Sequence, residues 1–347
     1  MTTTKTAHPD SNTNLPAKTA LWKRLLTNNT FLIFAVDIVL IAFFTIVSTN
    51  NTFLGAANLR NLMSDSATAL LLGIAIAFLL GAGEFDISLG ANLILSSVVA
   101  GTIAVQLAPF GLLIVIGGSL GGAILTGMAV GLLNGLVVTR LNVNSLIATL
   151  ATLGIVTGIA FIVSNGTDVT GIPQVLQDGF GLNTFLGIPV PFLIAIVVWG
   201  VAWLVLKYTR FGLHVVAMGS SRTAADRSGL RTKSKITVLF VVCGSLAGLA
   251  GFVDITRFAA TNIAGHAQDS LSAITAAVIG GTLLAGGVIS IVGLLGGVIL
   301  AVILANGLIV IGVSSYYQLI VVGVILIIAV WLDQMKKGEQ SFKLFAK

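Results

Sequence analysis

The stretch "GGSLGGAILTGMAVGLLNG" (residues 117–135) has no charged side chain and is long enough to cross most of a lipid bilayer as a helix. Within it, Gly127, Gly131 and Gly135 recur at intervals of four residues, so they fall on one face of a helix. Small residues at this spacing let two helix backbones approach closely inside a membrane. The stretch therefore predicts a transmembrane helix that packs against another helix through a glycine face.

Apolar segments of similar length occupy most of the chain. Of its 347 residues, 56% are hydrophobic and 9% are charged, whereas a soluble domain has roughly 25% charged residues. A helix needs roughly 20 apolar residues to span a bilayer. Hydropathy predicts about ten spans, with nine as the alternative count, at residues 31–49, 66–82, 88–108, 111–138, 144–163, 190–206, 236–253, 271–286, 290–311 and 316–333. The expected fold is an all-α, polytopic membrane protein with a transmembrane domain at residues 31–333.

The positions of Lys and Arg predict the orientation of these spans. With both ends of the chain on one side, all but two of the 18 Lys and Arg residues fall on that side, and Arg60 and Arg257 fall on the other. Cytoplasmic segments carry the excess of Lys and Arg. We therefore expect cytoplasmic tails at residues 1–30 and 334–347. The net charge of +6 reflects this orientation and does not call for a nucleic-acid partner.

Two longer segments lie outside the predicted spans. Residues 164–189 are polar and Gly-rich and are expected outside the cell, whereas residues 207–235 are basic and are expected in the cytoplasm. Neither reaches the length of about 50 residues that a domain usually needs. Any chemistry would therefore be carried by the membrane bundle itself or by another chain.

Three features that resemble reactive sites have simpler explanations. Ser119 lies in a GxSxG pattern, but the pattern is inside a predicted span and lacks the strand that precedes a hydrolase nucleophile. His214 and His266 do not have the spacing of metal ligands. Cys243 is the one cysteine, so it cannot form an intrachain disulfide. We predict no catalytic residue and no metal site.

A faint internal repeat relates two of the predicted spans. Residues 131–147 align with residues 303–320, and the match places Asn134-Gly135-Leu136 over Asn306-Gly307-Leu308. The two copies fall in the fourth and ninth spans, so they would have opposite orientations. A five-plus-five inverted repeat of this kind is common in transporters. A chance match in a chain so rich in Gly and Leu is the alternative.

Two acids stand in an otherwise apolar region, in "GEFDISLG" (residues 83–90). An ionised carboxylate in the middle of a bilayer costs about 2.5 to 3.5 kcal/mol, so Glu84 and Asp86 must lie near an interface or be satisfied in a cavity. Either the glycines form a turn in which Asp86 or Ser88 caps the next helix, or the acids belong to a polar pathway. Asp37, alone in the first span, is expected to face the interior of the bundle.

The segment "SSRTAADRSG" (residues 220–229) predicts a short helix in the basic cytoplasmic segment. Ser220 or Ser221 would begin this helix, and Gly229 would end it. A short amphipathic helix on the cytoplasmic face suits docking to a soluble partner. The alternative is an ordinary inside loop that has collected Lys and Arg.

Four segments, in order, resemble the permease subunits of bacterial ABC importers for monosaccharides, the ribose and galactose type. They are "GEFDISLG" (83–90), "NGLVVTRLNVNSLIATLATL" (134–153), "RFGLHVVAMGSSRTAADRSGL" (210–230) and the region 271–333. The resemblance covers about residues 50–333. Four residues depart from the family pattern: Glu84 and Ile289 stand where it has Gly, Ser221 where it has Asn, and Asn144 where it has Pro.

The resemblance implies partners on other chains. Two permeases, either two copies or a pair of paralogues, would form the pore in the bacterial inner membrane. A cytoplasmic ATPase would hold ATP and Mg²⁺, so no cofactor is expected on this chain. A periplasmic or extracellular sugar-binding protein would deliver the cargo, with residues 164–189 as its candidate surface.

The resemblance also assigns roles to individual residues. The segment that couples to the ATPase would comprise Gly219, Ser220, Ser221, Arg222, Ala224, Ala225, Asp226, Arg227, Ser228 and Gly229. A neutral sugar needs only a weakly polar path, for which Ser88, Asn134 and Asn306 are candidates. The alternative function is an ion-coupled secondary transporter in which Glu84, Asp86 and Asp37 relay a proton or a sodium ion.

Overall fold

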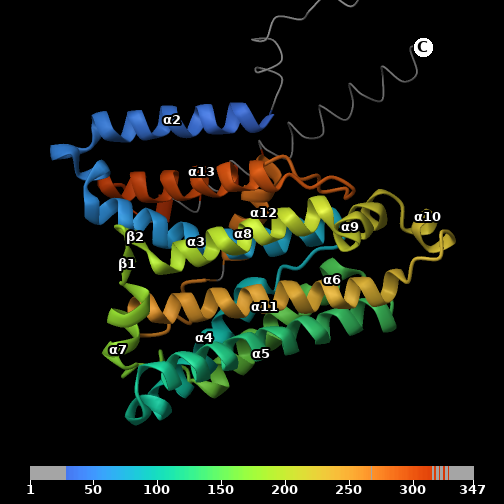
Figure 1. The fold of residues 1–347 in the computed structure, drawn as a ribbon, viewed down its shortest axis with the longest axis horizontal. Coiled ribbons are helices and arrows are strands. Elements are labelled where there is room, and N and C mark those ends of the chain that lie inside the picture. Colours follow the sequence, from blue (N-terminus) through green and yellow to red (C-terminus); the bar gives the residue numbers. More distant parts are fainter. Residues whose placement is uncertain are drawn as a thin grey trace, which may run out of the picture.

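The computed structural model describes residues 29–266 and 268–314, together with residues 316, 317, 320, 323, 324 and 327. In this part of the chain, eight helices are long and apolar enough to cross a membrane. They are α2 (Asn29–Val47), α3 (Ala56–Gly81), α4 (Leu89–Leu107), α5 (Leu112–Arg140), α6 (Ser145–Val163), α8 (Val190–Tyr208), α11 (Thr232–Phe258) and α13 (Ile291–Val310). The helices run roughly along one direction (Figure 1), which confirms an all-α, polytopic membrane protein.

Shorter elements mark the two ends of this bundle. Helices α9 (Arg210–Ser220) and α10 (Arg222–Arg227) lie at the right in Figure 1, at what we call the α10 end. The opposite end, the α7 end, carries α7 (Gln174–Leu176), a π-helical turn (Gln177–Gly181) and the antiparallel strands β1 (Thr184–Phe185) and β2 (Ile188–Pro189). Short 3₁₀ turns at Thr49–Leu54 and Ala108–Phe110 follow α2 and α4.

The glycine face of α5 packs against α11. A Cβ atom on Gly127 would collide with the carbonyl oxygen of Gly244, and one on Gly131 would collide with that of Phe240. A Cβ atom on Gly135 would lie 3.0 Å from the Cα of Thr237. The two backbones are therefore in direct contact over two turns, as the spacing of the glycines predicts.

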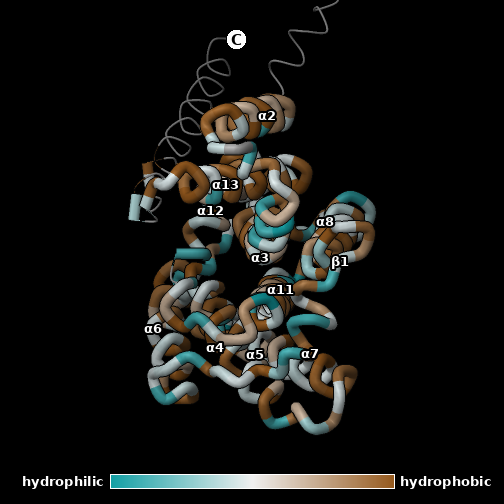
Figure 2. Tube along the Cα trace, turned by 90° about the vertical axis from the view of Figure 1, so that its left-hand side faces the viewer, coloured by the Kyte–Doolittle hydropathy of each residue, from teal (hydrophilic) through white to brown (hydrophobic). Residues whose placement is uncertain are grey.

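The outer helices keep large apolar side chains on their surface. Ile46 of α2 and Val197 of α8 are exposed, and the end-on view in Figure 2 shows hydrophobic residues on the outside of the bundle as well as within it. An apolar outer surface of this extent fits contact with lipid rather than with water. Helices α3 and α11, by contrast, are mostly buried.

Two predicted spans differ from the observed helices. Helix α3 begins at Ala56, ahead of the predicted residue 66, because polar residues such as Arg60 and Asp65 lower the hydropathy of its first turns without ending the helix. Asp65 forms an ion pair with Arg257 at the end of α11. The predicted span 271–286 is wrong: α12 (Asp269–Ile279) has 11 residues and ends before a turn.

The turn after α12 explains that error. Gly281, Gly286 and Gly287 have φ angles of 93°, 86° and 79°, which side chains rarely adopt, so residues 280–290 cannot continue the helix although they are apolar. The predicted span 316–333 falls mostly outside the described residues. The tails at residues 1–30 and 334–347 lie there too, apart from residues 29 and 30.

Helices α4 and α12 both begin inside the bundle. The chain leaves helical geometry after Gly81 and resumes it at Leu89, and the N–H of Gly90 donates to the Oγ of Ser270 at the start of α12 (2.8 Å). At 1.5 Å per residue, Gly251 lies roughly 28 Å along α11 from Thr232. It packs against Leu93, near the start of α4, so α4 begins well inside the bundle. Two passages of the chain through the bundle are thus interrupted, each being helical over only part of its length.

Helices α5 and α13, which come directly after the two interrupted passages, run in opposite directions. Helix α5, which contains Asn134, runs toward the α10 end in Figure 1, and α13, which contains Asn306, runs away from it. Helix α5 packs on α4, and α13 packs on α12. This arrangement agrees with the inverted repeat predicted from the match between residues 131–147 and 303–320.

A half-buried charge cluster joins α11 to α12. The Nε2 atom of His266 lies 3.1 Å from Oδ2 of Asp254, and its Nδ1 atom lies 2.7 Å from Oδ2 of Asp269. Burial by itself lowers the pKa of His266, but the two carboxylates outweigh this effect and raise the pKa to about 10. The two carboxylates therefore favour the protonated form of the imidazole.

Replacing His266 with glutamine should make stability less dependent on pH. Because the pKa of His266 is about 10 in the fold, against an ordinary 6.5, its contribution is complete below pH 6.5 and is lost as pH rises through about 10. In detergent at pH 6.5, the wild type should have a higher melting temperature than His266→Gln. The difference between the two melting temperatures should decrease toward pH 10. A constant gap across this range would contradict the assigned charge state.

Candidate functional site

Two short helices form the α10 end of the bundle. The segment 207–235, expected to be a loop with one short helix, instead contains α9 and α10, and α11 begins at Thr232. The predicted helix is confirmed as α10: the Oγ of Ser221 accepts from the N–H of Ala224 (3.3 Å), and Gly229 has a φ of 85° after the helix ends. Helix α9 was missed, although Thr209 caps it and Val215 and Met218 are buried.

Three glycines bring α9 against both interrupted passages. Gly219 of α9 lies against the carbonyl of Gly81, where α3 ends, and against the N–H of Gly287 in the turn after α12. The N–H of Gly287 donates to the carbonyl of Gly81 (3.0 Å). A side chain on Gly219 would have no room, so this glycine junction (Gly81, Gly219 and Gly287) is a contact between backbones.

An ion pair connects α10 to the segment between α3 and α4. The Nη1 of Arg222 lies 2.8 Å from Oε1 of Glu84. The side chain of Glu84 is only 6% exposed, whereas that of Arg222 is 44% exposed. On the far side of α10, the hydroxyl of Thr232 donates to Asp226 (2.6 Å), which holds α10 against the start of α11.

The segment 82–88, which we call the unwound segment, is held by hydroxyl groups of α6. The N–H of Phe85 donates to the Oγ of Ser145 (3.1 Å), and the N–H of Ile87 donates to the Oγ1 of Thr149 (3.2 Å). Ser145 and Thr149 are one helical turn apart, so they replace the partners that a helix would supply to this backbone. Sequence reasoning missed both residues.

Asp86, Ser88 and Asn134 form one buried group. The Oδ1 of Asp86 accepts from the N–H (2.8 Å) and the hydroxyl (2.6 Å) of Ser88 at the start of α4. The Nδ2 of Asn134 donates to the Oγ of Ser88 (2.8 Å) and to Oδ2 of Asp86 (3.3 Å). The Oδ1 of Asn134 is buried and accepts from none of the residues that the structure describes.

Two predicted site residues lie elsewhere. Asn306 does not join Asn134; it exchanges two amide hydrogen bonds with Asn58 of α3 (2.9 and 3.0 Å). Asp37 is buried, as expected, but it lies on α2, which packs against α13. Glu84, Asp86 and Asp37 therefore do not form one polar path, which disfavours the ion-coupled alternative. Among the described residues, no group of three His, Cys, Asp or Glu side chains could hold a metal ion.

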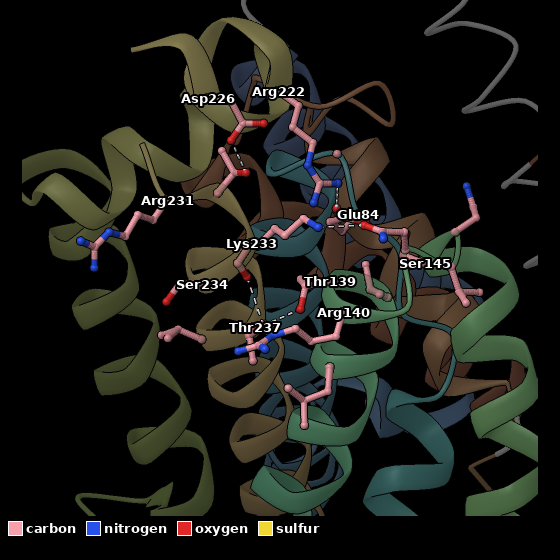
Figure 3. Close-up of a pocket in the computed structure, with 18 of the residues that line it drawn as sticks. Glu84, Thr139, Arg140, Ser145, Arg222, Asp226, Arg231, Lys233, Ser234 and Thr237 are labelled. Carbon is pink, nitrogen blue, oxygen red and sulfur yellow. Dashed lines mark hydrogen bonds and ion pairs between the residues drawn. The ribbon is translucent and has the colours of Figure 1, made fainter. Parts of the chain in front are cut away.

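A cavity of about 1230 Å³ lies between the unwound segment and the facing ends of α5 and α11 (Figure 3). Gly83, Glu84 and Phe85 of the unwound segment form part of its wall, and Arg222 and Arg140 also line it. In Figure 3 the side chains of Arg222 and Glu84 point toward each other. The cavity therefore borders the unwound segment, α10 and the facing ends of α5 and α11.

Comparisons with known proteins agree with this architecture. Residues 58–330 match the family described as "Branched-chain amino acid transport system / permease component". The ribose import permease of Bacillus subtilis (strain 168) is 36% identical over 291 residues, 83% of this chain and 88% of the relative. The ribose import permease of Escherichia coli (strain K12) is 33% identical over 303 residues, 86% of this chain and 92% of the relative.

Other relatives bear the names of different sugars. The L-arabinose ABC transporter permease of Azospirillum brasilense is 33% identical over 325 residues, which cover 93% of this chain and 92% of the relative. No solved structure matches the chain. The family match and these identities over nearly full length show that the chain belongs to the family of permease components that includes the sugar ABC import permeases.

Proposed function

We propose that this chain forms part of the pore of an ABC importer that moves a monosaccharide inward, with ATP hydrolysis on a separate subunit. One observation carries the proposal: α9, next to the exposed α10 at one end of the bundle, contacts both interrupted passages through Gly219, which lies against Gly81 and Gly287. The named relatives are ribose import permeases and an L-arabinose ABC transporter permease. On this proposal the α10 end, the N-terminal tail (residues 1–30) and the C-terminal tail (334–347) are cytoplasmic.

The ATPase would act through α9 and α10. A partner can drive a change in the membrane domain only through contacts that differ between its two states. Gly219 touches both interrupted passages, one at Gly81 and the other at Gly287. A displacement of α9 and α10 would therefore reach α4 and α12 together, and the pore could alternate between outward and inward openings.

The polar group around Asn134 suits a neutral, hydroxyl-rich cargo. Ser88 and Asn134 offer uncharged donors and acceptors, and the Oδ1 of Asn134 is an acceptor that the described residues leave unused. Because these side chains are fully buried here, a sugar hydroxyl would reach them only once the interrupted passages have moved apart, and it would then meet them with a hydrogen bond. Weak binding of this kind allows the cargo to leave again.

Further partners complete the importer. A second permease, either a copy or a paralogue, would supply the other half of the pore, and ATP and Mg²⁺ would be held by the ATPase. The sugar-binding protein would dock at the α7 end on residues 164–189. Phe185 and Leu186 of this segment are exposed at the turn of the β-hairpin, with exposed fractions of 65% and 88%.

Reconstitution tests the proposed function. The permease, together with the ATPase and the binding protein of the same importer, is placed in liposomes and offered ribose, arabinose, allose and galactose in turn. Uptake of at least one of these sugars that requires ATP is the expected result. Uptake by the permease alone, driven by a proton or sodium gradient, would instead support the ion-coupled alternative.

A further inference from the structure

The ion pair between Glu84 and Arg222 has a mechanical consequence that the glycine junction lacks. Arg222 is the first residue of α10, and Glu84 lies three positions beyond the end of α3. Within the described part of the chain, Arg222 is the one group that donates a hydrogen bond to the carboxylate of Glu84. Because the side chain of Glu84 is only 6% exposed, the loss of this partner would leave a buried carboxylate without a cation beside it.

Besides the hydrogen bond from Thr232 to Asp226 and the buried Val215 and Met218, two connections join the α9–α10 pair to the two interrupted passages, and these two resist different motions. At the glycine junction, backbone atoms of Gly219 touch those of Gly81 and Gly287, so α9 cannot move closer to them. Contacts of this kind transmit a push, but they offer little resistance to separation. An ion pair at 2.8 Å also resists separation, because moving Arg222 away would leave a buried carboxylate without its partner.

A force that draws Arg222 away from the bundle would act, through Glu84, on the buried group of Asp86, Ser88 and Asn134. Glu84 is two residues from Asp86, and the intervening backbone is held to α6 by the hydrogen bond from Phe85 to Ser145. Asp86 in turn binds Ser88 at the start of α4 and Asn134 of α5. The cavity borders both Glu84 and Arg222.

We propose, on the basis of the proposed function, that Glu84 is a positioning residue that lets α10 pull the unwound segment during the stroke in which the ATPase draws α10 away. The push of the opposite stroke passes through the glycine junction. Without the ion pair between Glu84 and Arg222, ATP hydrolysis continues while fewer sugars are moved for each ATP.

The test measures sugar uptake and ATP hydrolysis together in the full importer, with the sugar that the wild type takes up. Glu84→Gln and Arg222→Gln keep similar side-chain size and remove the ion pair. Each should lower the uptake per ATP by about fivefold or more, the lower range of coupling between sites, while ATP hydrolysis stays near that of the wild type. The double variant Glu84→Lys with Arg222→Glu restores a pair of opposite sign and should recover the ratio.

Arg140→Gln is the matched control, because Arg140 lines the same cavity and is exposed but forms no ion pair within the described residues. Its ratio of uptake to ATP should equal that of the wild type. If Glu84→Gln fails to reach the membrane, the more exposed Arg222→Gln decides the question. The role of Glu84 would be overturned if Arg222→Gln left the ratio of sugar uptake to ATP hydrolysis unchanged. It would also be overturned if the double variant folded but did not recover this ratio. Failure of the wild type to import any of the four sugars would instead count against the proposed function.

Discussion

Replacing Gly131 with valine should remove most of the folded protein from the membrane. The first side-chain carbon would collide with the carbonyl of Phe240, and the Cα of Val241 is also within 3.1 Å of it. Both obstacles are backbone atoms, so α5 and α11 would have to separate. Overpacking a core costs about 1 to 3 kcal/mol even when side chains can adjust, and these atoms cannot adjust without moving a whole helix.

Fluorescence-detected size-exclusion chromatography of the solubilised protein measures this effect as the height of the monodisperse peak. Gly121→Val is the matched control, because Gly121 lies on the same helix with nothing within 4 Å of its added carbon. Its peak should equal that of the wild type. Equal loss in both variants would mean that valine disturbs α5 for a reason other than its contact with α11.

Replacing Asp86 with alanine should lower sugar uptake, relative to the amount of protein in the membrane, by about tenfold or more. The carboxylate accepts from the N–H and hydroxyl of Ser88 and from the amide of Asn134. Each buried donor left without an acceptor costs about 1 to 3 kcal/mol, and 1.4 kcal/mol corresponds to a factor of ten in an equilibrium. The start of α4 would therefore lose its defined position.

Asp86→Asn separates shape from charge in this prediction. An asparagine side chain can still accept from Ser88, so uptake should fall less than in Asp86→Ala. Uptake and the amount of protein in the membrane are measured in parallel for both variants. Unaltered uptake and expression in Asp86→Ala would refute the idea that this carboxylate organises the start of α4.

The sequence predicts the membrane helices well where composition and conformation agree. Hydropathy finds α5 and its glycine face because both follow from residues close together in the chain. It fails at α12, since residues 280–290 are apolar but contain glycines with positive φ. It also starts α3 too late, because the charge of Asp65 is compensated by Arg257, which is distant in the sequence.

In the site, too, contacts between residues close in the sequence can be predicted, whereas contacts between distant residues cannot. Asp86 and Ser88 are two residues apart, so the turn before α4, in which Asp86 accepts from the N–H of Ser88, can be predicted from spacing, but the Ser88 side chain does not cap α4 as expected. The partners of Glu84 and of the unwound backbone come from elsewhere: Arg222 follows far along the chain, and Ser145 is on α6. A pair of hydroxyl residues spaced by four near the start of α6 was the one available signal, and such pairs are too common in apolar helices to be decisive.

The two interrupted passages bear on how this membrane domain can change shape at all. A continuous helix carries its own hydrogen bonds and can only tilt or bend as a rod. Backbone amides at Phe85, Ile87 and Gly90 are instead satisfied by the hydroxyls of Ser145, Thr149 and Ser270, each a separate bond that could be exchanged for another. The backbone in these segments can therefore exchange its hydrogen bonds one peptide at a time, without breaking a helix.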